Sequence, residues 1–167
     1  MAARLLLLAD THVPKRARDL PAQVWRAVEE ADVVIHAGDW VDVRLLDELE
    51  SRSGRLLAVV GNNDLGELRE RLPEVARTEV DGVRLGVVHD TGQATGREER
   101  TSRLHPDLDV LVFGHSHIPW DTVTPRGLRL LNPGSPTDRR RQPHCTFMWL
   151  EIGNGRVEVE LVRVIPR

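Results

Sequence analysis

The stretch LLLLADTH, residues 5–12, places four leucines and an alanine directly before an aspartate, a threonine and a histidine. An apolar run that is continuous rather than alternating is typical of a strand buried on both faces. The polar residues after it would then lie at the carboxyl end of that strand. We therefore expect a buried strand over residues 5–9 that leads into Asp10 and His12.

Four further apolar runs share this pattern along the first two-thirds of the chain. They cover residues 33–35, 56–60, 83–88 and 110–113. Each run is again continuous, so each is expected to form a strand with both faces covered. The sequence therefore predicts a core built around these five strands.

Two amphipathic segments separate the first three runs. Residues 19–31 predict a helix capped by Asp19. Residues 42–54 predict a second helix capped by Asp42. The apolar faces of the two helices, at helical spacing, consist of Val24, Trp25, Val28, Leu45, Leu46 and Leu49.

Residues 94–106 predict a weak, mostly solvated helix whose one good apolar anchor is Leu104. After Gly114 the pattern of the sequence changes. Residues 157–161 alternate between apolar and acidic side chains, as a half-exposed strand does. The turn at residues 153–155 would join that strand to the apolar segment 145–152.

The predicted order is strand–helix–strand–helix–strand, followed mostly by strands. This order favours an α/β sandwich with two sheets face to face and helices outside. The sequence contains no internal repeat, low-complexity tract or linker. We therefore expect residues 1–167 to form a single domain.

Composition excludes several classes of protein. The net charge of −3 argues against a nucleic-acid coat protein, and the single cysteine excludes an intrachain disulfide framework. The apolar run at residues 5–9 is shorter than a signal peptide requires, and no other stretch is long enough to span a membrane. The expected location is the cytoplasm.

Each of the five apolar runs is followed within a few residues by side chains that can bind a metal ion. Taken singly, these are weak signals because most such residues sit in turns, although the paired histidines of GHSH, residues 114–117, have few structural uses. Ligands of α/β sheets bind in the crevice outside the carboxyl ends of the strands. We expect one patch to contain Asp10, His12, Asp39, Asn62, His89, His115 and His117.

The chemistry of this set suits a pair of ions. Imidazole binds zinc, iron, nickel or manganese, and carboxylate and amide oxygens favour the harder ions. Seven protein ligands are too many for one ion with an open position, but they suit two ions that share a carboxylate. Two metal ions about 3.5–4 Å apart form the clamp used for in-line phosphoryl transfer.

The order D-x-H, G-D, G-N, a lone histidine and G-H-x-H resembles the calcineurin-like metallophosphoesterases. Residues 132–143, NPGSPTDRRRQP, resemble the C-terminal signature of their small single-domain prokaryotic phosphodiesterase branch. The resemblance implies a four-layer α-β-β-α sandwich in which helices flank two mixed β-sheets. It also implies a phosphodiesterase that acts on a small organic phosphate or nucleotide, and a homodimer.

By this resemblance, two divalent ions would share Asp39. One ion would also be held by Asp10, His12 and His117, and the other by Asn62, His89 and His115. The ions implied are Mn²⁺, which is favoured, or Ni²⁺, Fe²⁺ or Zn²⁺. A hydroxide bridging them would attack phosphorus in line.

Two positions depart from the superfamily pattern. Asn63 stands where a histidine is often taken to protonate the leaving group or contact the phosphate, and an amide cannot deliver a proton. Asp90 follows His89 where many relatives have glycine, and it could narrow the pocket or support a ligand. The catalytic residues expected from the resemblance are Asp39, Asn62, Asn63 and His115.

Three neighbours have a functional and a structural interpretation. Asp64 is expected to support the metal ligands. His36 would orient a ligand or serve as a buried structural histidine. Arg139, in the run of three arginines, would clamp the substrate phosphate or be a solvated charge.

Two alternatives to the phosphodiesterase remain open at this stage. One is a catalytically weak protein-binding scaffold on the same fold, and the other is a phosphomonoesterase, which Asn63 disfavours. The complete set of seven ligands favours the enzyme. We expect a small phosphate ester as the partner, and neither a membrane nor a stable nucleic-acid complex.

Overall fold

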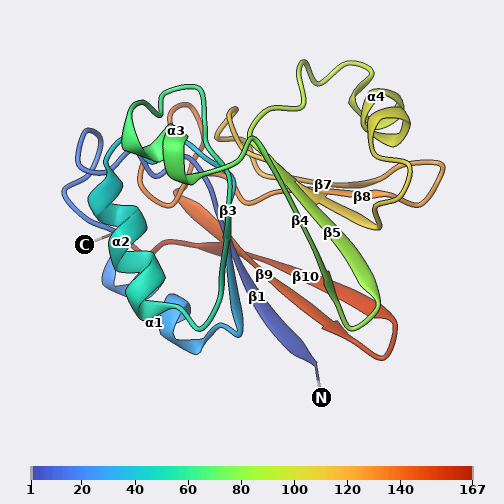
Figure 1. Cartoon of the computed structure of the whole chain (residues 1–167), viewed down its shortest axis with the longest axis horizontal. Coiled ribbons are helices and arrows are strands. Elements are labelled where there is room, and N and C mark those ends of the chain that lie inside the picture. The colour runs from blue at the N-terminus through green and yellow to red at the C-terminus, as the bar shows by residue number, and fades with distance from the viewer. Residues whose placement is uncertain (1, 167) are drawn as a thin grey trace.

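The computed structural model describes residues 2–166 and contains two mixed β-sheets of five strands each (Figure 1). The first sheet runs from edge to edge through β10 (Arg156–Arg163), β9 (Thr146–Gly153), β1 (Ala3–Leu8), β2 (Val33–His36) and β3 (Leu56–Ala58). In this sheet β1, β2 and β3 are parallel, and β9 is antiparallel to both β1 and β10. The carboxyl ends of the three parallel strands therefore meet at one edge.

The second sheet is built in the same way. It runs through β4 (Val75–Val80), β5 (Val83–Val88), β6 (Val110–Val112), β8 (Arg129–Asn132) and β7 (Trp120–Val123). The strands β5, β6 and β8 are parallel, while the outer strands β4 and β7 are antiparallel to their neighbours. The predicted pair of mixed sheets is confirmed.

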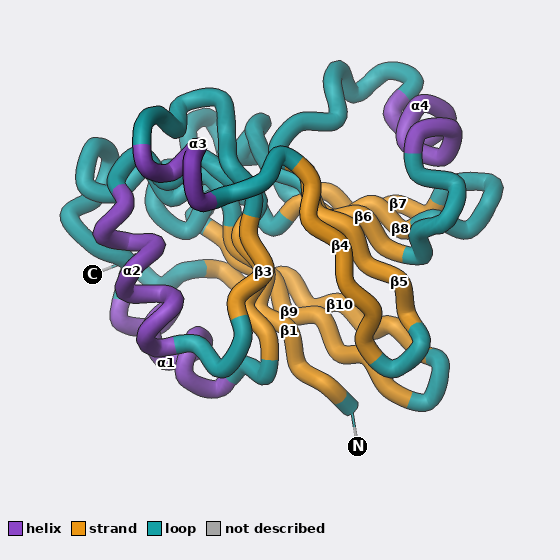
Figure 2. The backbone as a smooth tube through the Cα atoms, in the orientation of Figure 1, coloured by secondary structure: helices purple, strands orange, loops and turns teal. Residues whose placement is uncertain are grey.

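The helices are few and unevenly distributed over the two sheets (Figures 1 and 2). They are α1 (Ala22–Glu30), α2 (Val43–Arg52), α3 (Glu67–Arg71) and α4 (Arg97–Leu104). Buried residues of α1 and α2 pack with β1 and β2 in one core on the outer face of the first sheet. The second sheet has a smaller outer core, and α4 lies near it (Figure 1).

The leucines of β1 show why a continuous apolar run marks the centre of this fold. Leu5 and Leu7 point into the core between the two sheets, whereas Leu6 and Leu8 point into the core beneath the helices. All four side chains are fully buried. A strand whose successive side chains enter two different cores has no polar face, as predicted.

Two details of the predicted helices are wrong. Helix α1 begins after Pro21 without a side-chain cap, because the carboxylate of Asp19 instead accepts bonds from the Leu20 amide and from the indole N–H of Trp25. Leu104 of α4 is 62% exposed and does not anchor that helix. By contrast, Asp42 caps α2 as predicted, accepting a bond from the Arg44 amide.

The C-terminal hairpin forms as predicted between β9 and β10. Its tip contains Asn154 and Gly155, both with positive φ, which a tight hairpin turn requires. Among the helices within residues 2–166, none combines the length and the hydropathy that a membrane crossing would need.

Candidate metal centre

The loops after β1 and β2 are joined backbone to backbone at the carboxyl edge of the first sheet. The Asp10 amide donates to the Gly38 carbonyl at 2.9 Å, and the His12 amide donates to the Asp39 carbonyl at 3.1 Å. The second sheet meets this edge through the His115 amide, which donates to Asp10 Oδ1 at 3.2 Å. Side chains far apart in the sequence are thereby brought to one place.

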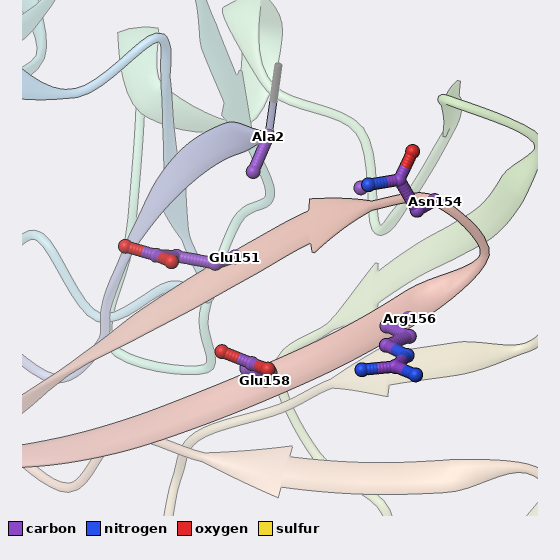
Figure 3. Close-up of a pocket in the computed structure, with 6 residues that line it drawn as sticks. Ala2, Glu151, Asn154, Arg156 and Glu158 are labelled. Carbon is purple, nitrogen blue, oxygen red and sulfur yellow. The ribbon is translucent and has the colours of Figure 1, made fainter.

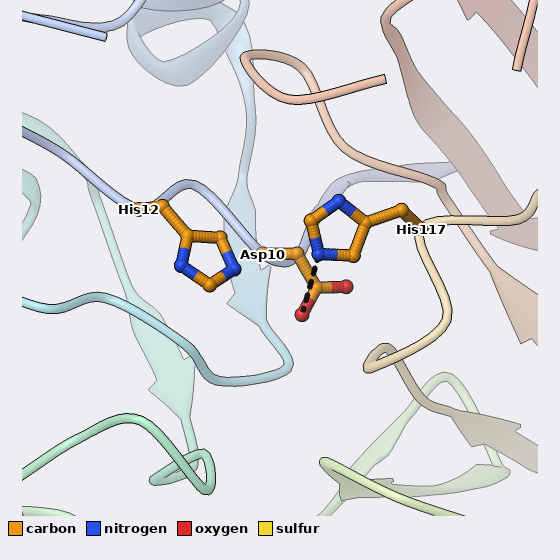
Figure 4. A group of neighbouring side chains, drawn as sticks. All are labelled: Asp10, His12 and His117. Atoms are coloured by element: carbon orange, nitrogen blue, oxygen red, sulfur yellow. Dashed lines mark ion pairs between the residues drawn. The ribbon is translucent and has the colours of Figure 1, made fainter. Parts of the chain in front are cut away.

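One group of candidate ligands consists of Asp10, His12 and His117. Their nearest nitrogen and oxygen atoms all lie within 4.8 Å of one another, and all three residues are buried. Figure 4 shows the rings of His12 and His117 near the carboxylate of Asp10, with a dashed line between Asp10 and His117. His117 Nε2 lies 3.9 Å from Asp10 Oδ1. The three residues therefore bring two imidazole nitrogens and a carboxylate oxygen close together.

Three atoms of this group have no hydrogen-bond partner within the described part of the chain. They are Asp10 Oδ2, His12 Nε2 and His117 Nε2. A buried polar atom without a partner costs about 1–3 kcal/mol. Three such atoms, on residues whose ligand atoms lie within 4.8 Å of one another, fit a metal ion, which would accept a lone pair from each residue.

A second group surrounds His89. Ligand atoms of Asp10, Asp39 and His89 also lie within 4.8 Å of one another. Asn62 Oδ1 lies 2.7 Å from His89 Nε2 and 3.1 Å from His115 Nδ1. The structure thus brings all seven sequence-predicted ligands into one cluster.

The carboxylate of Asp39 lies between the two groups. Its Oδ2 is 3.5 Å from His12 Nε2, and its Oδ1 is 3.5 Å from His89 Nε2. Each oxygen therefore faces a different imidazole. This is the placement that a carboxylate shared by two ions requires.

Backbone carbonyls orient two of the histidines. His89 Nδ1 lies 2.7 Å from the Ala37 carbonyl, and His117 Nδ1 lies 2.6 Å from the Asp138 carbonyl. A carbonyl can only accept, so Nδ1 carries the proton in each ring. In His117 the lone pair then resides on Nε2. In His89, Nε2 faces two acceptors, Asn62 Oδ1 at 2.7 Å and Asp39 Oδ1 at 3.5 Å, so a metal ion bound there would displace the proton that Nε2 donates to them.

Five of the seven candidate ligands have a left-handed backbone. The φ values are 55° for Asp10, 44° for His12, 62° for Asp39, 73° for His115 and 61° for His117. Non-glycine residues in this region cost on the order of 1 kcal/mol each and occur where surrounding contacts enforce them, often at functional sites. Glycine is required beside them at Gly61, where a Cβ would collide with the Asp39 amide nitrogen.

The carboxylate of Asp64 enforces part of this backbone. It is fully buried and accepts four amide bonds, from Trp40 and Val41 on Oδ1 and from Asp39 and Gly61 on Oδ2, at 2.7–3.0 Å. These four bonds fix the turn that carries Asp39 against the turn that carries Asn62.

His36 supports two of the ligand-bearing loops without touching a ligand side chain. Its Nδ1 accepts a bond from the Gly38 amide at 3.1 Å, and its Nε2 lies 3.0 Å from the Thr11 hydroxyl. The ring also stacks on Trp40 at a centroid distance of 3.6 Å. Complete burial lowers the pKa of His36 to about 3, so the ring is neutral.

The pKa values of the ionisable groups in the cluster are shifted in different directions. Burial raises the pKa of Asp10 to about 8, with a further rise from the Asp39 charge. Burial acts the same way on Asp39, but hydrogen bonds from His89 and Asn63 hold the pKa of Asp39 well below its ordinary value. Burial lowers the pKa of His12 and also lowers the pKa of His117, to about 4. Both imidazoles are therefore neutral at pH 7, and each can donate a lone pair to a metal ion.

Two of the sequence-predicted neighbours face the cluster and one does not. The Asn63 amide and Nδ2 donate to the two oxygens of Asp39 at 2.9 and 2.8 Å. Asp90 is exposed, with Oδ2 3.9 Å from His115 Nε2. Arg139 donates to the Gln142 carbonyl of its own loop and is not brought to the cluster.

Sequence reasoning missed the part played by the loop before β9. The Ser135 hydroxyl donates to the Asp10 carbonyl at 2.7 Å, and the Thr137 hydroxyl donates to the Thr11 carbonyl at 2.5 Å. Together with the Asp138 carbonyl, which orients His117, they hold the ligand loop after β1. The local signal was the Ser-x-Thr-Asp order inside the C-terminal signature.

A hollow of about 400 Å³ opens beside the cluster. Its walls include the candidate ligands His12 and Asn62, together with Asn63, Lys15, Arg16 and Arg140. A hollow of about 490 Å³ lies elsewhere, beside the β9–β10 hairpin, where Figure 3 shows Glu151, Asn154, Arg156 and Glu158. None of the candidate ligands lines that second hollow, so the first is the candidate site.

The two-sheet fold and the cluster of nitrogen and oxygen atoms at one end agree with the predicted class, the metallophosphoesterases. Residues 3–155 match the family model described as the calcineurin-like phosphoesterase superfamily domain. The chain belongs to this superfamily.

Two curated relatives agree with this assignment. A probable metallophosphoesterase from Methanothermobacter thermautotrophicus is 32% identical over 160 residues, which cover 94% of this chain and 90% of the relative. A protein from Methanocaldococcus jannaschii named as a phosphodiesterase is 30% identical over 101 residues, which cover 53% of this chain and 58% of the relative.

Solved structures show the same fold. The Thermotoga maritima protein TM1076 superposes with a TM-score of 0.77 at 35% identity, covering 97% of this chain and 99% of that one. Vacuolar Protein Sorting 29 from Cryptosporidium parvum superposes with a TM-score of 0.76 at 20% identity, covering 98% of each chain. The predicted superfamily and fold are confirmed.

Proposed function

We propose that this chain is a dinuclear-metal-dependent phosphodiesterase that hydrolyses a small organic phosphate or nucleotide. One observation carries the proposal. Three buried atoms, on Asp10, His12 and His117, have no hydrogen-bond partner within residues 2–166, and ligand atoms of these three residues lie within 4.8 Å of one another. If these side chains served only as structural hydrogen-bonding groups, their buried atoms would have hydrogen-bond partners. A metal centre instead requires ligand atoms whose lone pairs are not already used.

The proposed ligand sets are those that the family resemblance implies, and the two groups of side chains support them in part, since Asp10 belongs to both groups. One ion would be held by Asp10, His12, Asp39 and His117, and the other by Asp39, Asn62, His89 and His115. The position of Asp39 between His12 and His89 supports a bridging role. Mixed nitrogen and oxygen donors fit Mn²⁺, our first choice, and also Ni²⁺, Fe²⁺ or Zn²⁺.

When bound, two divalent ions would activate a water molecule for in-line attack on phosphorus and stabilise charge on the phosphate oxygens. The side chains of the protein would then orient the substrate and donate hydrogen bonds to it. His115 is 45% exposed at the mouth of the cluster, where a phosphate could reach it. Asn63 can donate a hydrogen bond to a phosphate oxygen but has no proton to give to a leaving group.

The lack of a proton donor at Asn63 supports diesters over monoesters. A general acid contributes about 10²–10⁴-fold when the leaving group is poor. The relative named as a phosphodiesterase points the same way. A phosphomonoesterase is the second candidate within the same chemistry, and a protein-binding scaffold is the candidate outside it. The scaffold has no need of a complete ligand set.

Two further properties belong to the proposal. We propose a homodimer, on the basis of the family resemblance, and a cytoplasmic location. Size-exclusion chromatography with light scattering would test the first. A mass that matches one chain at all concentrations would refute it.

The test of the proposed function measures the metal content of the protein and the rates at which it hydrolyses two aryl esters. The purified chain is loaded with Mn²⁺ or Ni²⁺, counted by mass spectrometry, and assayed with bis(p-nitrophenyl) phosphate and with p-nitrophenyl phosphate. Chelated protein is the matched control. We expect two ions per chain and faster hydrolysis of the diester. Two bound ions without hydrolysis of either ester would refute the enzyme, and faster hydrolysis of the monoester would favour the second candidate.

A further inference from the structure

Three cations line the hollow beside the candidate ligands, and they come from two loops. Lys15 and Arg16 follow the ligand loop after β1, and Arg140 lies in the loop before β9. Lys15 is the only lysine among the 167 residues. The ligand chemistry proposed above uses none of the three.

Two of these cations have no acidic partner within residues 2–166. Arg16 is neutralised, since its Nε lies 3.6 Å from Asp138 Oδ2. The same carboxylate is shared with His117, whose Nδ1 lies 3.9 Å from Oδ2. Lys15 and Arg140 form no ion pair and are exposed along the wall of the hollow.

Arg140 lines the hollow together with His12 and Asn62, two of the candidate ligands. Its neighbours in the arginine run differ, since Arg139 donates to the carbonyl of Gln142 and Arg141 does not line the hollow. Arg140 is therefore the member of the run that a substrate would meet.

An apolar wall completes the hollow. Leu65 is 74% exposed there, and Val41 lines the same space. An exposed leucine beside exposed cations suits a ligand that has an uncharged organic part between anionic groups.

The balance of charge favours more than one anion, and this step rests on the proposed function. Two divalent ions would bring four positive charges against two negative charges from Asp10 and Asp39. A phosphodiester adds only one negative charge. The hydroxide formed from the activated water adds one more, which balances the centre. Lys15 and Arg140 then leave a surplus of positive charge in the hollow, which a second anionic group would balance.

We propose that Lys15 and Arg140 bind a second, non-scissile phosphate of the substrate. The substrate class is then a phosphodiester that carries an additional terminal phosphate, and a nucleoside bisphosphate ester is the simplest example. Leu65 and Val41 would contact the organic part that joins the two phosphates. Lys15 and Arg140 determine specificity and do not act on the bond that breaks.

The kinetic test compares two substrates that differ in one phosphate. Thymidine 5′-(p-nitrophenyl phosphate) and its 3′-phosphorylated counterpart share the scissile bond and the leaving group. For the Mn²⁺-loaded protein we expect the 3′-phosphate to raise kcat/KM about tenfold through two charge-assisted contacts. The advantage should shrink as salt is raised from about 0.05 M to about 0.5 M, since exposed charges are screened.

Matched variants assign the effect to the two cations. Lys15→Gln and Arg140→Gln should each reduce the advantage of the 3′-phosphate, and the double variant should remove it. Arg141→Gln removes a charge from the same run outside the hollow and should leave the advantage intact. An advantage that survives the double variant would overturn the assignment to Lys15 and Arg140.

A binding measurement separates this inference from the proposed function. Calorimetry on metal-free and Mn²⁺-loaded protein gives the dissociation constants of thymidine 3′,5′-bisphosphate and thymidine 5′-monophosphate. We expect the bisphosphate to bind about tenfold more tightly in both states, and less so in the double variant. Equal dissociation constants in the wild type would refute the inference. A preference for the bisphosphate without hydrolysis of either ester would support the inference while refuting the phosphodiesterase.

Discussion

Asn63 holds the carboxylate of Asp39 through two donors, one from its backbone and one from its side chain. Both bonds go to the residue proposed as the bridge between two ions. The side-chain amide thus has two possible acceptors in the working site, Asp39 and a phosphate oxygen. Neither gives it the ability to protonate a leaving group, because an amide does not titrate near pH 7.

Asn63→His should therefore shift the reaction toward monoesters. An imidazole at this position can supply the proton that a poor leaving group needs, which contributes about 10²–10⁴-fold when fully effective. We expect the monoester-to-diester ratio of kcat/KM to rise at least about tenfold. Asn63→Ala is the matched control, since it removes the amide without adding an acid. An equal ratio in the two variants would contradict the missing-acid argument.

The burial of His36 predicts a specific loss of stability in acid. Its folded pKa is lowered to about 3 by burial, below the ordinary value of 6.5 in an unfolded chain. Between these values the unfolded chain binds a proton that the folded chain does not. The free energy of unfolding therefore falls as pH drops from about 6.5 toward about 3, by up to about 1.4 kcal/mol per pH unit.

Urea denaturation of chelated protein at several pH values tests this prediction. His36→Gln cannot titrate and should have a shallower dependence in that window. Since the variant also loses the bonds to Thr11 and Gly38, NMR titration of the wild-type ring provides a second measurement. A His36 resonance that titrates near pH 6.5 in folded protein would contradict the argument.

Which individual residues of the cluster could be predicted from the sequence depended on their local sequence context. The seven candidate ligands could be predicted because each follows an apolar run, and a strand end fixes where the next side chain lies. The bonds from Ser135 to Asp10 and from Thr137 to Thr11 could not, since they join residues 125 and 126 positions apart. Their existence depends on how the chain returns beside β1.

The helix α4 shows the limit of apolar patterning at the scale of an element. Its buried side chains are Arg97, Thr101 and Ser102, so a search for apolar anchors selects Leu104 instead. Arg97 lies 4.8 Å from the ring centroid of Phe113 and 4.5 Å from that of Trp120. A cation between two aromatic rings replaces the apolar contact that usually attaches a helix to a sheet.

Arg97→Ala should destabilise the protein by about 2 kcal/mol, since it removes both ring contacts and the bond to the Gly92 carbonyl. Leu104→Ala, on the same helix, should change stability by less than about 0.5 kcal/mol. Chemical denaturation of the two variants with metal removed gives both values. A larger loss from Leu104→Ala would mean that the exposed leucine anchors α4 after all.

Over the whole molecule, both sheets contribute candidate ligands to the same cluster. The first supplies Asp10, His12, Asp39 and Asn62 from its parallel strand ends, and the second supplies His89, His115 and His117 from its own. The strand-end rule predicts this convergence because both sheets present parallel edges on the same side. Five of these candidate ligands have a strained left-handed backbone, and the bond that Asp64 accepts from the Asp39 amide and the bond that Ser135 donates to the Asp10 carbonyl help to hold it.

Metal binding should therefore stabilise the entire fold. The free protein holds unpartnered atoms on Asp10, His12 and His117 and a proton on Asp10, whose pKa is raised to about 8 by burial. A metal satisfies the atoms and displaces the proton, so its affinity should rise with pH up to about 8. At about 100 times the dissociation constant, the gain of about 2.7 kcal/mol corresponds to a Tm about 5–11 °C higher.

Thermal unfolding of chelated protein with and without Mn²⁺ measures this shift. Asp39→Asn keeps the shape of the side chain but removes the charge proposed to hold both ions, so we expect most of the shift to disappear. Glu160→Gln neutralises an exposed carboxylate on β10 and serves as the control with a full shift. If Asp39→Asn retained the full shift, the Mn²⁺ would be binding outside the cluster, since that carboxylate is the contact common to both proposed ions.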